Sequence, residues 1–217
     1  MGWLSGEDFP RKYTVPSNWY GLWVSLTFPF YREGGGKRDL ICWESGVDTR
    51  FFTPLLPAIK KKHDYFIYWK SQNNDHIKQM YDYLFKNWFG THGPVLRYYC
   101  YTHEELKEAA QNSQFCIMID KSETQGLAAL EIMATNCPLF VLDYKQFHTN
   151  GKTFQGATSV CSWKEGVCGM KSSWEKLSED FPKFIENLPN YRPREFVENN
   201  YTFEICAKKL IEIGKNS

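Results

Sequence analysis

Several features that would assign a protein of this length at once are missing from the 217-residue sequence. No run of apolar residues approaches the ~20 that a membrane-spanning helix requires, and no N-terminal apolar segment resembles a signal peptide. The formal net charge is only +1, so the composition supplies no general attraction for nucleic acid or anionic membranes. We therefore predict a cytoplasmic protein that does not bind nucleic acid.

Paired cysteines are missing too. The seven cysteines are odd in number, scattered, and in several cases inside apolar runs, which indicates reduced, buried thiols. Cys161 and Cys168 are the one close pair, but a zinc site needs about four ligands, and no second Cys or His pair stands at a matching spacing. The sequence accordingly predicts no bound metal and no cofactor.

The common sequence motifs of ligand sites are absent as well. The glycines at 34–36 precede no suitable helix, so the dinucleotide fingerprint G-x-G-x-x-G does not occur, which argues against a nicotinamide dehydrogenase. NGKT at 150–153 imitates the end of a phosphate-binding P-loop, but Gln146 stands where that motif needs its first glycine. Neither Asp-x-Asp, a common holder of a divalent cation against a diphosphate, nor the G-x-S-x-G nucleophile elbow occurs.

From residue 40 onward, short apolar runs alternate with helical patterns. Strands are predicted at 40–43, 65–69, 94–101, 115–119 and 138–142, and helices at 75–88, 102–113 and 126–136. The strands are continuously apolar rather than alternating, which is typical of a parallel sheet with helices on both faces. We therefore predict an α/β fold with a Rossmann-like, doubly wound parallel sheet.

Two of these helices carry more specific signals. Apolar residues at i, i+3, i+4, i+7 and i+8 form one face of the helix at 75–88: Ile77, Met80, Tyr81, Leu84 and Phe85. Thr102 precedes the next helix with Glu105 three residues on, which is the pattern of a capping box.

The two ends of the chain differ from this middle. Residues 1–39 are aromatic and interrupted by prolines and glycines, so we predict an N-terminal segment or linker packing on a domain at 40–217. We interpret its aromatic residues as core contributors, and the alternative is a partner-facing or lipid-facing surface with peripheral membrane contact. After Gly151 the pattern predicts one strand, at 157–163, and helical stretches at 172–188 and 193–214 that pack across the sheet.

The segment DKSETQGLAALE at 120–131 carries the best candidate site. Ligands of doubly wound sheets bind beyond the carboxyl ends of the strands, where backbone N–H groups at Gln125, Gly126 and Leu127 would favour a phosphate. Carboxylates accept hydrogen bonds from hydroxyls, so a nucleotide sugar fits, with Glu131 toward the ribose and Glu123 toward the sugar. The alternative is that both glutamates only complement the helix dipole.

The sequence SETQGLAALEIMATNCPLFV resembles the E-x7-E segment of retaining GT-B glycosyltransferases. The matching positions are Glu123, Gly126, Glu131, Ala134 and Pro138. ESGVDTRFFTP resembles the same family's G-V-D-x-x-x-F-x-P turn, and TVPSNWY resembles its S-x-W segment near the domain linker. The resemblance spans roughly residues 14 to 212.

The resemblance implies the C-terminal, donor-binding half of a GT-B architecture, with the acceptor-binding N-terminal GT-B domain as a missing partner. The implied reaction is metal-independent transfer of a sugar from a nucleotide-sugar donor to a glycan or other hydroxyl acceptor, with retention. Lys70 would contact the diphosphate, with Lys78 as second choice, and Glu123 would orient the sugar. The family's arginine is not found beside Lys70. Tyr101 and Thr102 would border the nucleobase.

Two other classes of function stay open from the sequence. One is a noncatalytic module that binds a nucleotide sugar or a carbohydrate without turnover. The other is a structural or interaction domain that uses the aromatic N-terminal segment.

Overall fold

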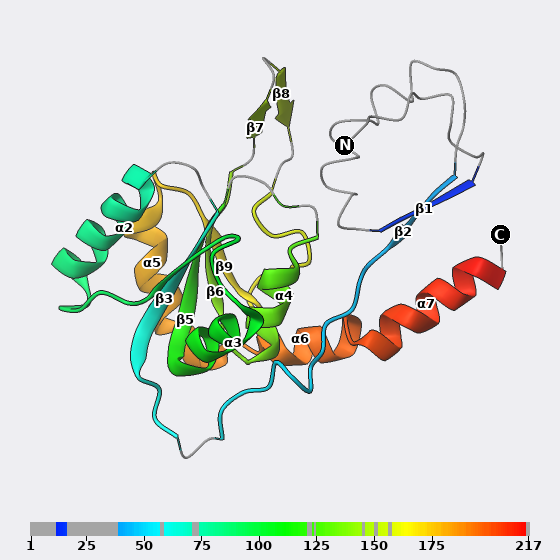
Figure 1. Cartoon of the computed structure of the whole chain (residues 1–217). Coiled ribbons are helices and arrows are strands. Elements are labelled where there is room, and N and C mark those ends of the chain that lie inside the picture. Colours follow the sequence, from blue (N-terminus) through cyan, green and yellow to red (C-terminus); the bar gives the residue numbers. More distant parts are fainter. Residues whose placement is uncertain are drawn as a thin grey trace.

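A five-stranded parallel sheet forms the centre of the molecule (Figure 1). The computed structural model describes residues 12–16, 39–56, 59–70, 74–120, 123, 125–144, 146–149, 152–155 and 158–215. The strands of the sheet are β3 (His63–Trp69), β4 (Val95–Arg97), β5 (Ser113–Ile119), β6 (Leu139–Leu142) and β9 (Gly169–Ser172). Their spatial order is β4-β3-β5-β6-β9, and every neighbouring pair is parallel.

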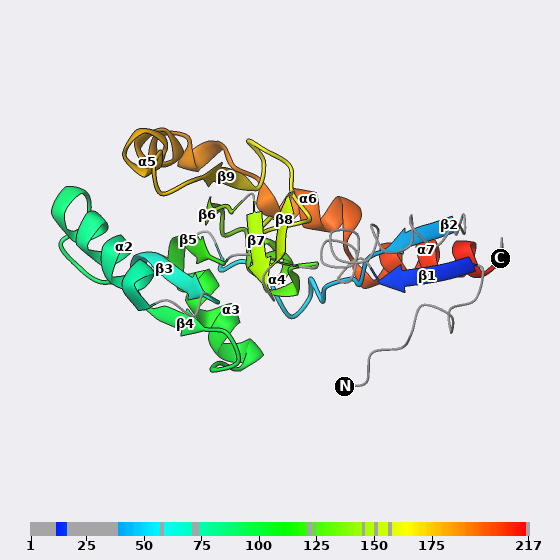
Figure 2. The same ribbon diagram turned by 90° about the horizontal axis from the view of Figure 1, so that it is seen from above.

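Helices cover both faces of this sheet. The helices are α2 (Asn74–Asn87), α3 (His103–Asn112), α4 (Leu127–Ala134), α5 (Leu177–Glu186) and α6 (Pro193–Asn200), with a 3₁₀ turn at Leu188–Asn190. Seen from above, α2 and α5 lie on one side of the strands and α3, α4 and α6 on the other (Figure 2). The predicted Rossmann-like, doubly wound α/β fold is therefore confirmed.

The continuously apolar strands feed two separate cores. In β5, Phe115, Ile117 and Ile119 belong to the cluster under α2 and α5, whereas Cys116 and Met118 belong to the cluster under α3, α4 and α6. All five are at most 1% exposed. A strand buried on both faces has no position for a polar side chain, which explains the unbroken apolar run.

The order of the strands reverses between β3 and β5. The chain passes from β3 through α2 to the edge strand β4, and then returns through α3 to β5 on the other side of β3. The loops after β3 and β5 therefore lead to opposite faces of the sheet, and doubly wound folds bind their ligands at such a switch point.

The signals for the two middle helices had different outcomes. The capping box of α3 is confirmed, because the Thr102 hydroxyl accepts from the Glu105 N–H and the Glu105 carboxylate accepts from the Thr102 N–H. In α2, the predicted apolar face is partly buried, because Met80 and Leu84 are buried and Phe85 is 55% exposed. The Phe85 ring stacks on His92 at the edge of this face.

The strands at the two ends of the prediction also need correction. Residues 98–100 form a turn after β4, and 158–163 form no strand. The fifth strand is β9 instead, and a hairpin of β7 (Gln146–Thr149) and β8 (Lys152–Gln155) projects beyond the carboxyl edge of the sheet (Figure 1). The predicted helix at 193–214 is divided at Tyr201 into α6 and α7 (Phe203–Lys215).

A small second unit lies beside the sheet. β1 (Lys12–Pro16) pairs in parallel with β2 (Asp39–Trp43), so the predicted strand at 40–43 exists but is not part of the main sheet. The Trp43 indole Nε1–H donates to the Cys206 carbonyl of α7 over 2.8 Å. The division at residue 39 stays a prediction, and the aromatic residues between 17 and 38 lie outside the described residues.

Two findings concern the thiols and the helices. Six cysteines whose side chains the structure describes are unpaired, and four of these are buried, namely Cys116, Cys137, Cys168 and Cys206. None of the helices in the described part of the chain is long and apolar enough to cross a membrane.

Candidate functional site

The switch point at the ends of β3 and β5 brings a lysine against two acids. Lys70 follows β3 directly, and its backbone N–H donates to the Ile119 carbonyl at the end of β5 over 3.0 Å. Its Nζ lies 2.8 Å from Glu123 Oε2 and 3.4 Å from Asp120 Oδ2. The side chains of Lys70, Glu123 and Asp120 are 20%, 13% and 5% exposed, so the charges meet largely out of water.

The electrostatics of Lys70 follow from these neighbours. Burial by itself lowers the pKa of a lysine, but the fields of Asp120 and Glu123 outweigh it, and the pKa of Lys70 is raised. The Nζ also lies 4.8 Å from the centroid of the Tyr98 ring, a cation–π distance. Lys70 is therefore a permanently charged group at the switch point.

Asp120 is the site residue that sequence reasoning missed. It is 3% exposed and stands one position after β5, where the strand has just left the apolar core. The signal was present in the sequence, because an acid directly after a continuously apolar strand must lie at the carboxyl edge of the sheet.

The N-terminus of α4 lies next to this cluster. Gly126 is its N-cap residue, with a left-handed φ of 79°, and as a glycine it supplies no side-chain hydrogen bond to the first turn. A Cβ on Gly126 would also lie 3.1 Å from Cγ of Glu123, so glycine suits both the conformation and the space. The free helix N-terminus and its dipole provide a favourable environment for an anion.

The residues on either side of Gly126 have different environments. The buried Gln125 uses its side-chain amide to bind the backbone of Ser45, accepting from its N–H over 3.2 Å and donating to its carbonyl over 2.6 Å. The Leu127 side chain is 39% exposed. That the backbone N–H groups of Gln125, Gly126 and Leu127 contact a phosphate stays a prediction.

Glu131 lies further along α4 and is not part of the Lys70 cluster. Its side chain is 14% exposed, and one oxygen lies 3.5 Å from His103 Nε2. Burial raises the pKa of Glu131 to about 7, and the charge of His103 opposes this increase. A carboxylate with such a pKa is half protonated near neutral pH, which is uncommon for a glutamate that merely complements a helix dipole.

The loop between β4 and α3 closes the site on the other side. The Tyr101 hydroxyl donates to the Tyr68 hydroxyl over 3.2 Å, and burial, with the charges of Glu131 and Glu123, raises the pKa of Tyr101. Tyr101 therefore lies within the field of both glutamates. Thr102 is exposed and uses its hydroxyl in the capping box.

The predicted residues thus form two neighbouring groups. Lys70 and Glu123, with Asp120 added, form one, and Glu131 and Tyr101 lie in the other, with the N-terminus of α4 next to Glu123. Lys78, the second choice for a diphosphate contact, is exposed on α2. Within the described residues, no three His, Cys, Asp or Glu side chains are arranged to hold a metal ion.

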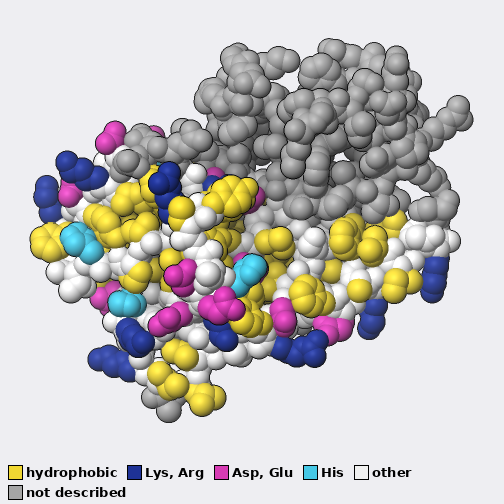
Figure 3. All heavy atoms as spheres, in the orientation of Figure 1, with side chains coloured by type: hydrophobic (Ala, Val, Ile, Leu, Met, Phe, Trp, Pro, Cys, Tyr) yellow, Lys and Arg dark blue, Asp and Glu magenta, His cyan; other side chains and the backbone are white. Residues whose placement is uncertain are grey.

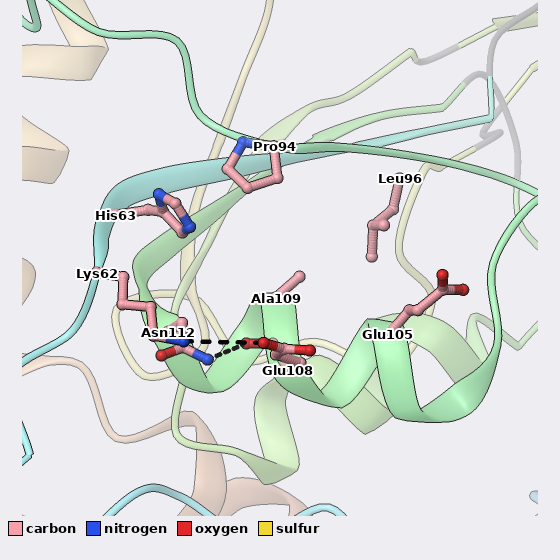
Figure 4. Close-up of a pocket in the computed structure, with 8 residues that line it drawn as sticks. All are labelled: Lys62, His63, Pro94, Leu96, Glu105, Glu108, Ala109 and Asn112. Carbon is pink, nitrogen blue, oxygen red and sulfur yellow. Dashed lines mark hydrogen bonds and ion pairs between the residues drawn. The ribbon is translucent and has the colours of Figure 1, made fainter.

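A separate hollow lies between the edge strand β4 and α3 (Figure 4). Its floor is partly apolar, from Pro94, Leu96 and Ala109, and its rim includes the ion pair of Lys62 with Glu108. None of the predicted site residues lines it. The hollow is therefore distinct from the site at the carboxyl edge of the sheet.

Comparison with solved structures identifies proteins of the same architecture. Sucrose-phosphate synthase from Thermosynechococcus elongatus matches at 14% sequence identity and a TM-score of 0.51, over 94% of this chain and 58% of that one. A glycosyltransferase from Rickettsia africae ESF-5 matches at 13% identity and a TM-score of 0.55, over 94% of this chain and 68% of that one. The fold matches that of GT-B glycosyltransferases.

Each match covers only part of the other protein. The chain spans 58% of the length of the synthase and 68% of the length of the Rickettsia protein. No protein family's sequence profile matches the chain, and no curated protein matches it. The GT-B likeness therefore concerns the fold alone, and any activity depends on the residues of the site.

Proposed function

We propose that this chain is the donor-binding half of a retaining, metal-independent glycosyltransferase. The observation that carries the proposal is the meeting of Lys70 and Glu123 at the switch point, next to the uncapped N-terminus of α4. A cation and a helix N-terminus together suit a diphosphate, and carboxylates on either side suit hydroxyl groups. A nucleotide sugar carries both kinds of group in this order.

The site also suggests how such a transfer is promoted. Negative charge develops on the departing phosphate, so Lys70 and the backbone N–H groups at Gly126 and Leu127 would stabilise the transition state more than the bound donor. Glu123 would hold the hydroxyls of the transferred sugar, and Glu131 those of the ribose. The leaving phosphate would assist deprotonation of the acceptor, so the proposal needs no dedicated base from this chain.

Binding measurements with three variants test the proposal. We expect one or more of the UDP-, GDP-, ADP- and dTDP-sugars to raise the melting temperature of the chain. Lys70→Met and Glu131→Ala should each weaken nucleotide-sugar binding about tenfold or more in calorimetry, since each removes a charged hydrogen-bond partner. Glu123→Ala should reduce turnover more than affinity. Lys183→Met, which removes an exposed lysine of α5, serves as the control.

Unchanged affinity for every sugar nucleotide in Glu131→Ala would overturn the ribose assignment. Unchanged affinity in Lys70→Met would overturn the diphosphate assignment.

A noncatalytic binding or interaction module is the second candidate, and one observation favours it. Helix α7 exposes three apolar side chains, with Phe203 51%, Leu210 41% and Ile211 57% exposed. Donor hydrolysis by the chain, or transfer once an acceptor domain is supplied, would decide against this candidate. If no nucleotide shifts the melting temperature, the interaction role is favoured.

A further inference from the structure

A short loop, in a segment for which the sequence predicted a strand, contacts the backbone of both acids of the site. Residues 158–161, here called the strap, lie at the carboxyl edge of the sheet. The buried Ser159 places its hydroxyl 2.6 Å from the carbonyl oxygen of Asp120 and 3.0 Å from that of Leu142. The strap therefore links the ends of β5 and β6.

The strap also contacts Glu123 through two backbone groups. The Glu123 N–H donates to the Thr158 carbonyl over 2.9 Å, and the Cys161 thiol donates to the Glu123 carbonyl over 3.0 Å. Glu123 belongs to a loop rather than to a helix or strand, so its place depends on such contacts. The position of its carboxylate beside Lys70 is thus tied to the position of the strap.

An ion pair fixes the strap in turn. The Thr158 hydroxyl donates to Asp143 Oδ1 over 3.0 Å and accepts from Lys171 Nζ over 2.7 Å. The Ser159 N–H donates to Asp143 Oδ1 over 2.7 Å, and Lys171 Nζ donates to the Val160 carbonyl over 2.8 Å. Asp143 follows β6 and Lys171 lies in β9, so two strands of the rigid sheet supply the anchor.

The partial burial of the Asp143–Lys171 ion pair indicates that it fixes geometry rather than adding stability. Asp143 and Lys171 are 18% and 22% exposed, with 3.9 Å between Oδ2 and Nζ, so both charges are largely withdrawn from water. A partly buried ion pair adds little net stability over an apolar pair, but it fixes geometry where each charge also forms hydrogen bonds. Here those hydrogen bonds all end on the strap.

We propose that Asp143, Lys171 and Thr158 are positioning residues, which set the place of Glu123 and Asp120 beside Lys70 through the strap. The inference rests on the proposed function for the role of Glu123. A displacement of a reacting group by about 1 Å lowers the rate on the order of 100-fold, so a loop-borne carboxylate needs this support. The strap provides the support from a distant part of the sequence.

A matched pair of variants at Thr158 tests the proposal without any ligand. Thr158→Val keeps the shape of the side chain and removes its hydroxyl, whereas Thr158→Ser keeps the hydroxyl. We expect Thr158→Val to accelerate amide hydrogen exchange at Glu123 about tenfold or more, while Thr158→Ser stays near the unaltered protein. The Ile117 amide of β5 serves as the reference and should not change.

A second experiment measures the rate of turnover. Its substrate is the nucleotide sugar that raises the melting temperature of the chain most. Lys171→Met should lower turnover about 10- to 100-fold and leave nucleotide affinity within about twofold, as expected for a residue that orients a reacting group. Lys183→Met is again the control, because that lysine pairs with Glu179 on the exposed side of α5.

The outcomes separate the two proposals. Equal exchange at Glu123 in folded Thr158→Val and Thr158→Ser would overturn the positioning role. If Thr158→Val does not fold, Cys161→Ala, which removes only the thiol contact to Glu123, takes its place in the same comparison with the unaltered protein. If no nucleotide sugar binds the unaltered chain, the proposed function fails, and the exchange rates still decide the role of the strap.

Discussion

At the scale of single residues, the site depends on ionisable groups that are withdrawn from water. Glu131 is the clearest case, because burial raises its pKa from 4.5 to about 7. An acid whose pKa is raised on folding holds more protons in the folded than in the unfolded state between these two values. Folding stability is therefore expected to fall as the pH rises from about 4.5 to about 7, and the loss is complete above that window.

Glu131→Gln should remove most of this pH dependence. The variant keeps a polar side chain of the same shape without the charge, so near pH 8 it should be more stable than the unaltered protein by up to about 3 kcal/mol. Urea denaturation across this pH range measures the effect. Glu108→Gln, at an exposed acid of α3, should leave the pH profile unchanged, and parallel profiles for both variants would contradict the prediction.

The residues of the site were partly predictable from the sequence. Glu123 and Glu131 were identified from their places before and within the helix that follows a buried strand and Gly126, and Lys70 from the resemblance to GT-B glycosyltransferases. Asp143 and Lys171 were not identified, because their importance comes from contact with the strap. Lys171 also lies 28 positions beyond Asp143, in a strand that the sequence did not predict. Pairings of this kind are set by tertiary structure, which one sequence does not display.

At the scale of elements, β9 shows how a strand escapes prediction. Its sequence GMKS has neither an apolar run nor alternation, and pairing with β6 forms it. Gly169 begins it with a φ of 142°, and a Cβ there would overlap the carbonyl oxygen of Leu139. Glycine is uncommon in strands, but here it permits the close approach of two backbones.

Gly169→Ala should therefore destabilise the protein by at least about 2 kcal/mol, because both the backbone angle and the contact with β6 are unfavourable for alanine. Chemical denaturation measures the change. Gly90→Ala is the matched control, since its Cβ would meet open space, and it should change stability by less than about 1 kcal/mol. Similar losses at both positions would show that the approach of β9 to β6 is not the cause.

At the scale of the whole molecule, the charges are mixed over the surface, whereas the apolar core is concentrated at the sheet. Acidic and basic side chains are interspersed on the face drawn in Figure 3, in keeping with the net charge of +1. Both apolar clusters lie against the five-stranded sheet, and neither includes a residue of α7. Of the residues of α7, only Cys206 is buried.

We expect α7 to open locally without unfolding of the sheet. Its amides should exchange with deuterium at least about 100-fold faster than those of β5, because few apolar contacts hold the helix in place. Mass spectrometry of peptides from the two segments measures the difference, with α3, which has three buried residues, as the internal control. Equal protection of α7 and β5 would instead indicate a single cooperative unit.

The contact between Lys70 and Glu123 has a consequence for the order of events during turnover. Glu123 is a counter-ion of Lys70 in the structure, so on the proposed function an arriving diphosphate must take over the lysine from it. The displaced carboxylate then needs a new partner, and the hydroxyls of an intact donor supply one. After transfer the nucleotide no longer carries the sugar whose hydroxyls bound Glu123. Glu123 then competes with the spent nucleotide for Lys70. The same ion pair would thus favour retention of the substrate and departure of the product.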